Sequence, residues 1–250
     1  MGLIDLAHRL FRSSQVSTPA DTRIYVIGDI HGRCDLLKEM QEKINNDIYN
    51  SENISKIIKV FLGDYIDRGE QSRQVIDFFL QDRQQETESI YLKGNHEATL
   101  LKFLCDPGIL SSWQNFGGLE TLHSYGVRLA GMKESGGFET IRQQFLDLLP
   151  REHFDFYHSL QKSVSLGDYF FCHAGVKPGV SLEKQREEDL IWIREEFLES
   201  NADYGKVIVH GHTPVNQPEI WKNRINIDTG AYLSNKLTCL VLEGDSKKCL

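Results

Sequence analysis

Five short polar loops, each directly after an apolar run, constrain the fold of this chain more than any other feature of the sequence. The apolar runs are Ile24–Ile27, Ile57–Leu62, Ile90–Lys93, Tyr169–Cys172 and Lys206–Val209, and they are rich in Val, Ile, Tyr and Phe. The loops read GDIHG at 28–32, GDYIDRG at 63–69, GNHE at 94–97, HAG at 173–175 and HGHT at 210–213. This pattern predicts strands that each end in a polar turn. In open α/β sheets, sites form outside the carboxyl ends of the strands, so the five loops are expected to converge.

Helical patterns separate the predicted strands. The predicted helices are Asp35–Ile48, Ser72–Gln81, Glu97–Phe103, Phe138–Leu149 and His153–Leu160, and further strands are predicted at Ile225–Ile227 and Leu237–Leu242. The alternation of strands and helices indicates an α/β fold whose sheets are covered by helices. The length of 250 residues suits one large domain, which we place at residues 23–250.

The first 22 residues are predicted to form an N-terminal helix followed by a polar linker. Leu3, Leu6, Leu10 and Phe11 recur at helical spacing, and residues 13–22 are mostly polar. Two interpretations stay open for the helix. It binds another surface, or it packs on its own domain or is a frayed end.

Charge and cysteine content exclude several classes of protein. The net charge of −8 argues against general nucleic-acid binding, which needs a basic surface to neutralise phosphates. The sequence has no run of about 18 apolar residues, so we predict no membrane span. The five cysteines are odd in number and lack CxxC spacing, so we expect a reducing, cytoplasmic location. Cys172 and Cys239 are expected in the core, whereas Cys34 could be reactive or buried.

The polar residues of the loops form a set of metal ligands without a thiolate. The set is Asp29, His31, Asp64, Asn95, His173 and His212. Carboxylate, amide and imidazole donors suit Mn²⁺, Fe or Zn²⁺ better than Ca²⁺, which prefers oxygen cages. Six ligands are too many for one open catalytic ion, but they suit two ions with one bridging carboxylate. Two-metal sites place their ions roughly 3.5–4 Å apart, where both can bind a phosphate and activate a water.

Three further residues of these loops suit the remaining steps of phosphate-ester cleavage. His96 lies beside Asn95 and is the candidate general acid for the departing oxygen. Asp67 could accept a hydrogen bond from the other ring nitrogen, and Arg68 could bind phosphate oxygens in a bidentate manner. A purely structural alternative is that Asp64, Asp67 and Asn95 cap helices.

The motifs GDIHG, GDYIDRG, GNHE, HAG and GHTP, in this order, resemble those of the phosphoprotein phosphatase family of calcineurin-like metallophosphoesterases. The family includes Ser/Thr protein phosphatases, phage lambda phosphatase and symmetrical diadenosine tetraphosphatases. The resemblance extends from about residue 23 to residue 243. It implies a β-sandwich flanked by helices, in α/β/β/α layers, with the active site at the carboxyl ends of the strands.

The resemblance also implies a role for each matching residue. Asp29 and His31 would hold the first metal, Asp64 would bridge, and Asn95, His173 and His212 would hold the second. His96 and Asp67 would be the acid and its orienting partner, and Arg68, Arg194 and Asn95 would bind the substrate phosphate. Arg194, within LIWIRE at 190–195, could instead make surface ion pairs. His210 competes with His212, and the GHTP motif places the ligand at His212.

Two other segments are left open by the sequence. Trp113, Asn115, Gly117 and Gly118 resemble a WxxNGG segment near the site of short family members, but Phe116 alters the spacing between the asparagine and the glycines. Asp228, after the strand predicted at 225–227, is either a neighbour of the metal ligands or a turn residue.

The resulting functional expectation is a two-metal phosphomonoester hydrolase with a metal-bridging hydroxide as nucleophile and a His general acid. The preferred substrate is a phosphoprotein, which makes it a Ser/Thr or broad-specificity protein phosphatase, and Mn²⁺ is the expected metal, with Fe or Zn²⁺ as alternatives. A symmetrical dinucleoside polyphosphate hydrolase is the alternative that shares the same core. A non-catalytic module that retains the fold is the alternative from another class. The motifs leave the oligomeric state open.

Overall fold

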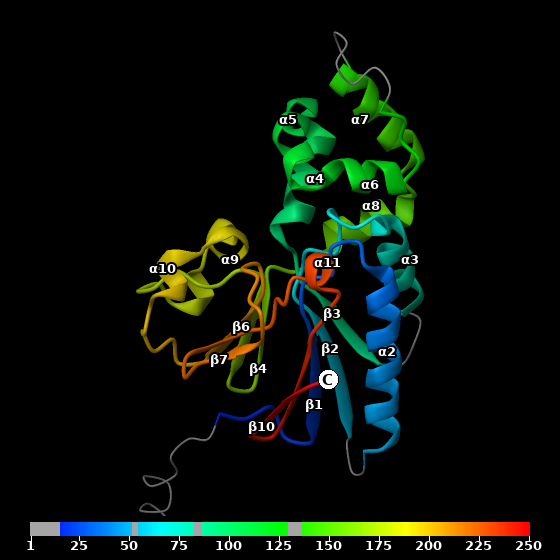
Figure 1. The fold of residues 1–250 in the computed structure, drawn as a ribbon. Helices are drawn as coiled ribbons and strands as arrows, with labels where there is room; N and C mark the ends of the chain where they lie inside the picture. The colour runs from blue at the N-terminus through cyan, green and yellow to red at the C-terminus, as the bar shows by residue number, and fades with distance from the viewer. Residues whose placement is uncertain (1–15, 52–54, 83–86, 130–136) are drawn as a thin grey trace, which may run out of the picture.

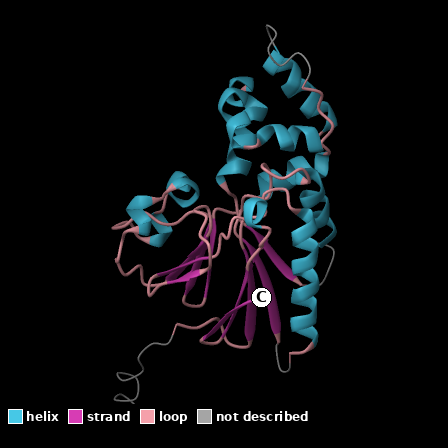
Figure 2. Ribbon diagram, viewed as in Figure 1, coloured by secondary structure: helices cyan, strands magenta, loops and turns pink. Residues whose placement is uncertain are grey.

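Two five-stranded sheets form the centre of the protein (Figures 1 and 2). The computed structural model describes residues 16–51, 55–82, 87–129 and 137–250. The first sheet has the order β10 (Ser246–Cys249), β9 (Cys239–Glu243), β1 (Thr22–Ile27), β2 (Lys56–Phe61) and β3 (Glu88–Tyr91). The second has the order β4 (Ser163–Leu166), β5 (Tyr169–Cys172), β6 (Val207–His210), β8 (Arg224–Asn226) and β7 (Glu219–Ile220).

The central strands of each sheet run parallel, which directs their carboxyl ends to one edge. In the first sheet β1 pairs in parallel with β2, and β2 with β3. In the second sheet β5 pairs in parallel with β6, and β6 with β8. The polar loops follow β1, β2, β3, β5 and β6, so the expected convergence of the loops is built into the topology.

Apolar side chains divide the molecule into four layers, which confirms the predicted α/β/β/α sandwich. Ile24, Val60, Phe171 and Val209 belong to the cluster buried between the two sheets. The other face of the first sheet packs on α2 (Cys34–Tyr49) and α3 (Ser72–Asp82), and the other face of the second packs on α9 (Glu187–Trp192) and α10 (Glu195–Leu198).

A group of helices stands over the carboxyl ends of the strands (Figure 1). It comprises α4 (Asn95–Cys105), α5 (Leu110–Trp113), α6 (Gly118–Ser124), α7 (Gly137–Leu148) and α8 (Arg151–Ser159), and we call it the helical layer. The short helix α11 (Ala231–Ser234) lies at the junction between this layer and the sheets (Figure 1). No helix in the described ranges is both long and apolar enough to cross a membrane.

Each strand and helix predicted from residue 23 onward begins and ends within two residues of its predicted bounds. The sequence missed β4, β7 and β10, which are short or polar and lie at sheet edges, where solvent removes the need for an apolar run. Residues 1–15, with the predicted N-terminal helix, lie outside the described residues. The described end of the expected linker is held on the domain, because Thr18 N donates to the carbonyl of Gly244 and Ser17 N to the Asp168 carboxylate.

A buried ion pair fixes the outer end of α3 to the first sheet. Lys59 of β2 and Asp82 of α3 are 1% and 2% exposed, and their side chains are in direct contact. Asp82 also accepts hydrogen bonds from Ser89 Oγ and Tyr91 OH. Loss of one charge would leave the other buried without its partner, which is costly.

Asp82→Ala should therefore lower the free energy of unfolding by about 3–5 kcal/mol, the usual effect of breaking a buried pair. Urea denaturation measures this change. The matched control is Glu88→Ala, because Glu88 pairs with Lys56 at the surface, where both side chains are about half exposed. The control should lose at most about 1 kcal/mol. Equal losses in the two variants would contradict a special role for the buried pair.

Candidate active site

Asp64 stands at the centre of the converged loops. Its Oδ2 lies 3.6 Å from His31 Nε2, 3.3 Å from His173 Nε2 and 3.8 Å from His96 Nε2. Two groups of potential metal ligands share this carboxylate: one adds His31 and His96, the other adds His173 and His212. All these residues are buried. Asp64 belongs to both donor groups, which is the geometry expected of a bridging ligand.

The tautomers of two of these histidines are set by backbone carbonyls. His31 Nδ1 lies 2.9 Å from the carbonyl of Ile66, and His173 Nδ1 lies 3.0 Å from the carbonyl of Leu62. Each Nδ1 can donate to its carbonyl, and in the neutral ring this leaves the Nε2 lone pair directed at Asp64 Oδ2. For His173, Nε2 also lies 2.9 Å from Asn95 Oδ1. Facing lone pairs of this kind fit a cation, and a carbonyl on the outer nitrogen is the usual support of a metal-binding imidazole.

Asp29 lies outside the two tight groups but next to them. Its Oδ2 accepts a hydrogen bond of 3.0 Å from His212 N. Its Oδ1 and the Nε2 of His212 are both buried without a hydrogen-bond partner among the described residues. Buried polar atoms are rarely left unpaired in proteins, so these two atoms also fit metal ligation.

The electrostatics of the cluster favour a bound cation. Burial lowers the pKa of His31 to about 4 and that of His212 to about 2, which keeps both rings neutral at pH 7. Burial, Asp228 and Asp64 together raise the pKa of Asp29 well above its ordinary value. Neutral imidazoles are metal ligands, and a divalent ion would relieve the repulsion between the carboxylates.

The loops reach this geometry only with unusual backbone conformations. Positive φ angles occur at seven non-glycine residues of the described chain, and five of them belong to the loops: His31, Asp64, Asp67, Arg68 and His212. Each such residue costs of order 1–3 kcal/mol, and strain of this kind concentrates at functional sites. Close approach requires glycine at two positions: a Cβ at Gly94 would lie 2.1 Å from Asp64 Oδ1, and one at Gly211 would lie 2.0 Å from Asp29 Oδ1.

His96, in the first turn of α4, has the environment of a proton donor. Its Nδ1 lies 2.6 Å from Asp67 Oδ2, and its Nε2 faces Asp64. Burial lowers the pKa of His96, but Asp64 and Asp67 outweigh this effect and raise it to about 9. The ring therefore carries a proton at pH 7, in contrast to His31 and His212.

Glu97 is a structural residue of the site that the sequence reasoning missed. Its fully buried carboxylate accepts hydrogen bonds from Gly94 N (3.0 Å), Asp64 N (3.0 Å), Tyr65 N (2.7 Å) and Ile66 N (3.3 Å). It thereby holds the loop after β2 against the loop after β3. The GNHE motif contains Glu97, but nothing in the sequence indicates that its carboxylate binds the backbone of another loop.

An arginine and an aromatic ring stand at each side of the cluster. The Arg68 guanidinium lies 5.5 Å from the ring centre of Tyr232 on α11, and Tyr232 contacts the ring of His31 at 5.2 Å between centres. On the other side, exposed Arg194 donates to Thr213 Oγ1 at 3.1 Å, and Trp192 lies 6.2 Å from His212 between ring centres. Both predicted phosphate-binding arginines thus border the centre.

The structure locates the residues whose roles the sequence left open. His210 ends β6, as expected, and packs on Phe197, whereas His212 joins the cluster. Asn115 is exposed, and its Nδ2 donates to the carbonyl of Ser111. Asp228 is buried near Asp29 and accepts a hydrogen bond from Gly230 N at 2.9 Å. All five cysteines are free, and Cys34 is buried together with Cys172 and Cys239.

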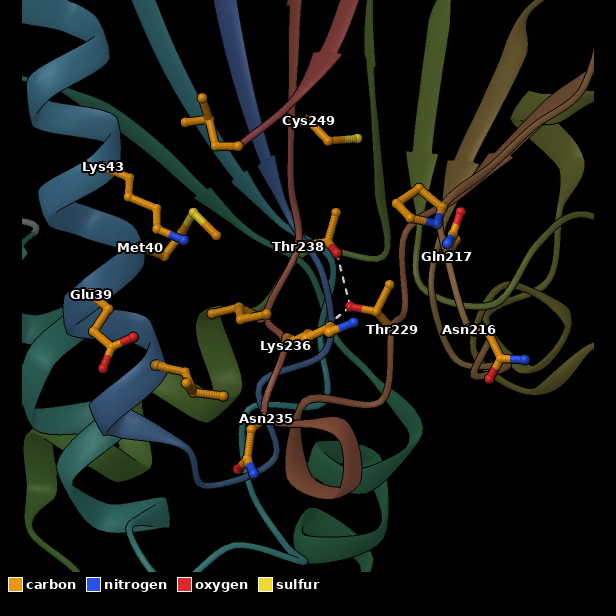
Figure 3. Close-up of a pocket in the computed structure, with 14 residues that line it drawn as sticks. Glu39, Met40, Lys43, Asn216, Gln217, Thr229, Asn235, Lys236, Thr238 and Cys249 are labelled. Carbon is orange, nitrogen blue, oxygen red and sulfur yellow. Dashed lines mark hydrogen bonds between the residues drawn. The ribbon is translucent and has the colours of Figure 1, made fainter.

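A separate pocket lies between α2 and the loops that flank α11 (Figure 3). Its volume is about 350 Å³, and Met40, Lys43, Gln217 and Lys236 are among the residues that line it. None of the predicted metal, acid or phosphate-binding residues contributes to its lining. The pocket and the loop cluster are therefore distinct features.

The fold and the buried cluster of His and Asp donors define a metal-dependent phosphoesterase. The chain belongs to the calcineurin-like phosphoesterase family, whose model matches residues 22–240. Members of this family use a dinuclear centre of divalent metals, and the donors described above fit such a centre.

Several individual proteins resemble this chain over most of its length. An asymmetrical bis(5′-nucleosyl)-tetraphosphatase, PrpE of Oceanobacillus iheyensis, is 30% identical over 86% of this chain and 87% of its own. A proposed diadenosine tetraphosphatase of known structure matches with a TM-score of 0.59 at 16% identity, over 93% of this chain and 95% of its own. A cold-active protein tyrosine phosphatase matches with a TM-score of 0.57 at 16% identity, over 96% and 83%. The two structural matches show the shared fold.

Asp64→Asn should remove most of the bound metal and nearly all activity, because Asp64 lies between both donor groups. Metal content after gel filtration, measured by elemental analysis beside the wild type, checks the first expectation. The matched control is Asp168→Asn, which removes an exposed carboxylate that belongs to neither donor group. An Asp64→Asn protein with full metal content would refute a bridging position.

Proposed function

We propose that this protein hydrolyses small phosphorylated substrates at a two-metal centre, and that dinucleoside polyphosphates are its preferred substrates. The observation that carries the proposal is the arginine and aromatic pair on each side of the centre. Arginine suits phosphate oxygens, and aromatic rings suit nucleobases. A molecule with phosphates between two bases matches this arrangement. The similarity to tetraphosphatases over most of the chain supports the same substrate class.

Each predicted residue has a place in this proposal. Asp29, His31 and Asp64 would hold one ion, and Asp64, Asn95, His173 and His212 the other, with Mn²⁺ favoured by the mixture of oxygen and imidazole donors. When bound, such ions lower the pKa of a water molecule and offset the negative charge of the phosphate.

The protein's own groups supply the remaining steps. The guanidinium groups of Arg68 and Arg194 would orient the phosphate through paired hydrogen bonds. His96 would donate its Nε2 proton to the departing oxygen, while Asp67 holds the Nδ1 proton. The hydrogen bond to Asp67 favours the protonated form of His96, which makes the proton available for donation.

The protein phosphatase activity favoured by the motifs remains the competing hypothesis, because the metal core serves both reactions. A second distinction concerns the position of cleavage. The motifs suggested a symmetrical dinucleoside polyphosphate hydrolase, whereas the relatives are named asymmetrical. Symmetrical cleavage of diadenosine tetraphosphate yields two ADP molecules, and asymmetrical cleavage yields ATP and AMP.

One purified preparation, loaded with Mn²⁺, should be compared on diadenosine tetraphosphate and on Ser/Thr phosphopeptides. We expect a higher kcat/KM for the dinucleotide, with ATP and AMP as products by liquid chromatography. A higher value for the phosphopeptides would support the competing hypothesis instead. Absence of turnover on both substrates with Mn²⁺, Fe²⁺ and Zn²⁺ would sink the hydrolase proposal.

Trp192→Ala should raise the KM for diadenosine tetraphosphate by roughly tenfold, since stacking of a base on an aromatic ring contributes about 1–3 kcal/mol. The KM for phenyl phosphate, which has no nucleobase, should be unchanged. Trp221→Ala is the matched control, because Trp221 is similarly exposed but packs on Arg224 beside β7. An equal rise in KM for both substrates would argue against base stacking.

His96→Asn should reduce kcat by about 10²–10⁴ for substrates with poor leaving groups, the usual size of an acid contribution. The reduction should be much smaller for 2,4-dinitrophenyl phosphate, whose leaving group departs without a proton. Steady-state kinetics on phenyl and dinitrophenyl phosphates provide the comparison. The same reduction on both substrates would contradict the assignment of His96 as the acid.

A further inference from the structure

The carboxylate that holds His96 is itself held by the helical layer. Asp67 is completely buried, and its Oδ2 accepts both His96 Nδ1 at 2.6 Å and Trp113 Nε1 at 2.7 Å. Its Oδ1 accepts the hydroxyl of Thr121 on α6, and Thr121 Oγ also accepts Asp67 N at 2.9 Å. Hydrogen-bond donors of this kind replace the water that a buried carboxylate has lost.

The two donors are located so that they restrict the imidazole. Trp113 Nε1 takes one acceptor position of Oδ2 and Thr121 binds Oδ1, so the other acceptor position of Oδ2 is taken by His96 Nδ1. An indole N–H is a donor only, and it cannot exchange roles with the ring of His96. The arrangement leaves His96 Nε2 directed at the metal-ligand cluster, 3.8 Å from Asp64 Oδ2.

Trp113 is itself held firmly. It is fully buried, and its ring lies 5.1 Å from that of Phe103 between centres. A Cβ at Gly118 would lie 2.4 Å from the indole, and a Cβ at Gly117 would lie 2.3 Å from Arg68 N. The two glycines thus allow the segment 113–118 to pack against both Asp67 and Arg68.

We propose that Trp113 is a positioning residue for the general acid, acting through the hydrogen bond from its Nε1 to Asp67. Thr121 performs the same task on the other carboxylate oxygen. This inference rests on the proposed role of His96 and extends it. The helical layer, to which His96 and the proposed ligand Asn95 belong through α4, thereby sets the geometry of proton donation.

Trp113→Phe deletes the N–H group and keeps an aromatic ring against Gly118 and Phe103. We expect a roughly ten- to hundredfold loss of kcat on phenyl phosphate, the size of a hydrogen bond to a charged group. The loss should be much smaller on 2,4-dinitrophenyl phosphate, and KM and bound metal should be unchanged. In the His96→Asn background the same change should have no further effect on kcat, since residues that act through one another are not additive.

Two further variants keep the test decisive. Thr121→Val removes the other donor and should give the same dependence on the leaving group, even if Trp113→Phe fails to fold. Tyr125→Phe is the control, because Tyr125 is buried in the same layer but hydrogen-bonds His153 and Tyr157 instead of Asp67. It should leave the ratio of the two rates unchanged.

The outcomes separate this inference from the proposed function. If His96→Asn shows the leaving-group dependence while Trp113→Phe and Thr121→Val lose activity equally on both substrates, the positioning role is overturned and the acid stands. If Trp113→Phe lowers kcat further in the His96→Asn background, the positioning role is also overturned. If His96→Asn itself shows no leaving-group dependence, the proposed acid fails first.

Discussion

The hydrogen bonds to the buried carboxylate of Glu97 are the constraint on which the site depends. Four backbone N–H groups from two loops meet at this one side chain, and each would be buried without a partner in its absence. Asp64 and Gly94 are among the residues so held, and Asp64 adopts a positive φ. A single acid therefore offsets the backbone strain that brings the central metal ligand into place.

The sequence predicted the sandwich and the composition of the cluster because both depend on patterns that it displays directly. Apolar runs mark buried strands, and glycine-flanked polar residues mark the turns after them. The edge strand Ser246–Cys249 has no such run, because solvent covers one side. Trp113 and Glu97 lie in motifs that the sequence displays. Their contacts with Asp67 and with the loop after β2 form between chain segments that meet only in the folded state.

In the proposed function, chemistry and specificity are carried by different parts of the molecule. The metal ligands lie at strand ends, where the register of the sheets fixes them. Tyr232 and Trp192 instead belong to the short helices α11 and α9, outside the strands that end at the ligands. On this proposal the motifs identify the reaction more sharply than the substrate, because they contain the metal ligands and not the two aromatic residues.

The hydrogen bonds from Trp113 and Thr121 to Asp67 have a consequence for the behaviour of the protein during local unfolding. Most ligands of the cluster are anchored in the sheets, but the support of the proton donor is anchored in helices that can open separately. In the proposed function, opening of α5 and α6 alone would release the support of His96 while the ligands at the strand ends stay in place. Metal occupancy and catalytic competence are then two different measures of the native state, and heat or denaturant should separate them.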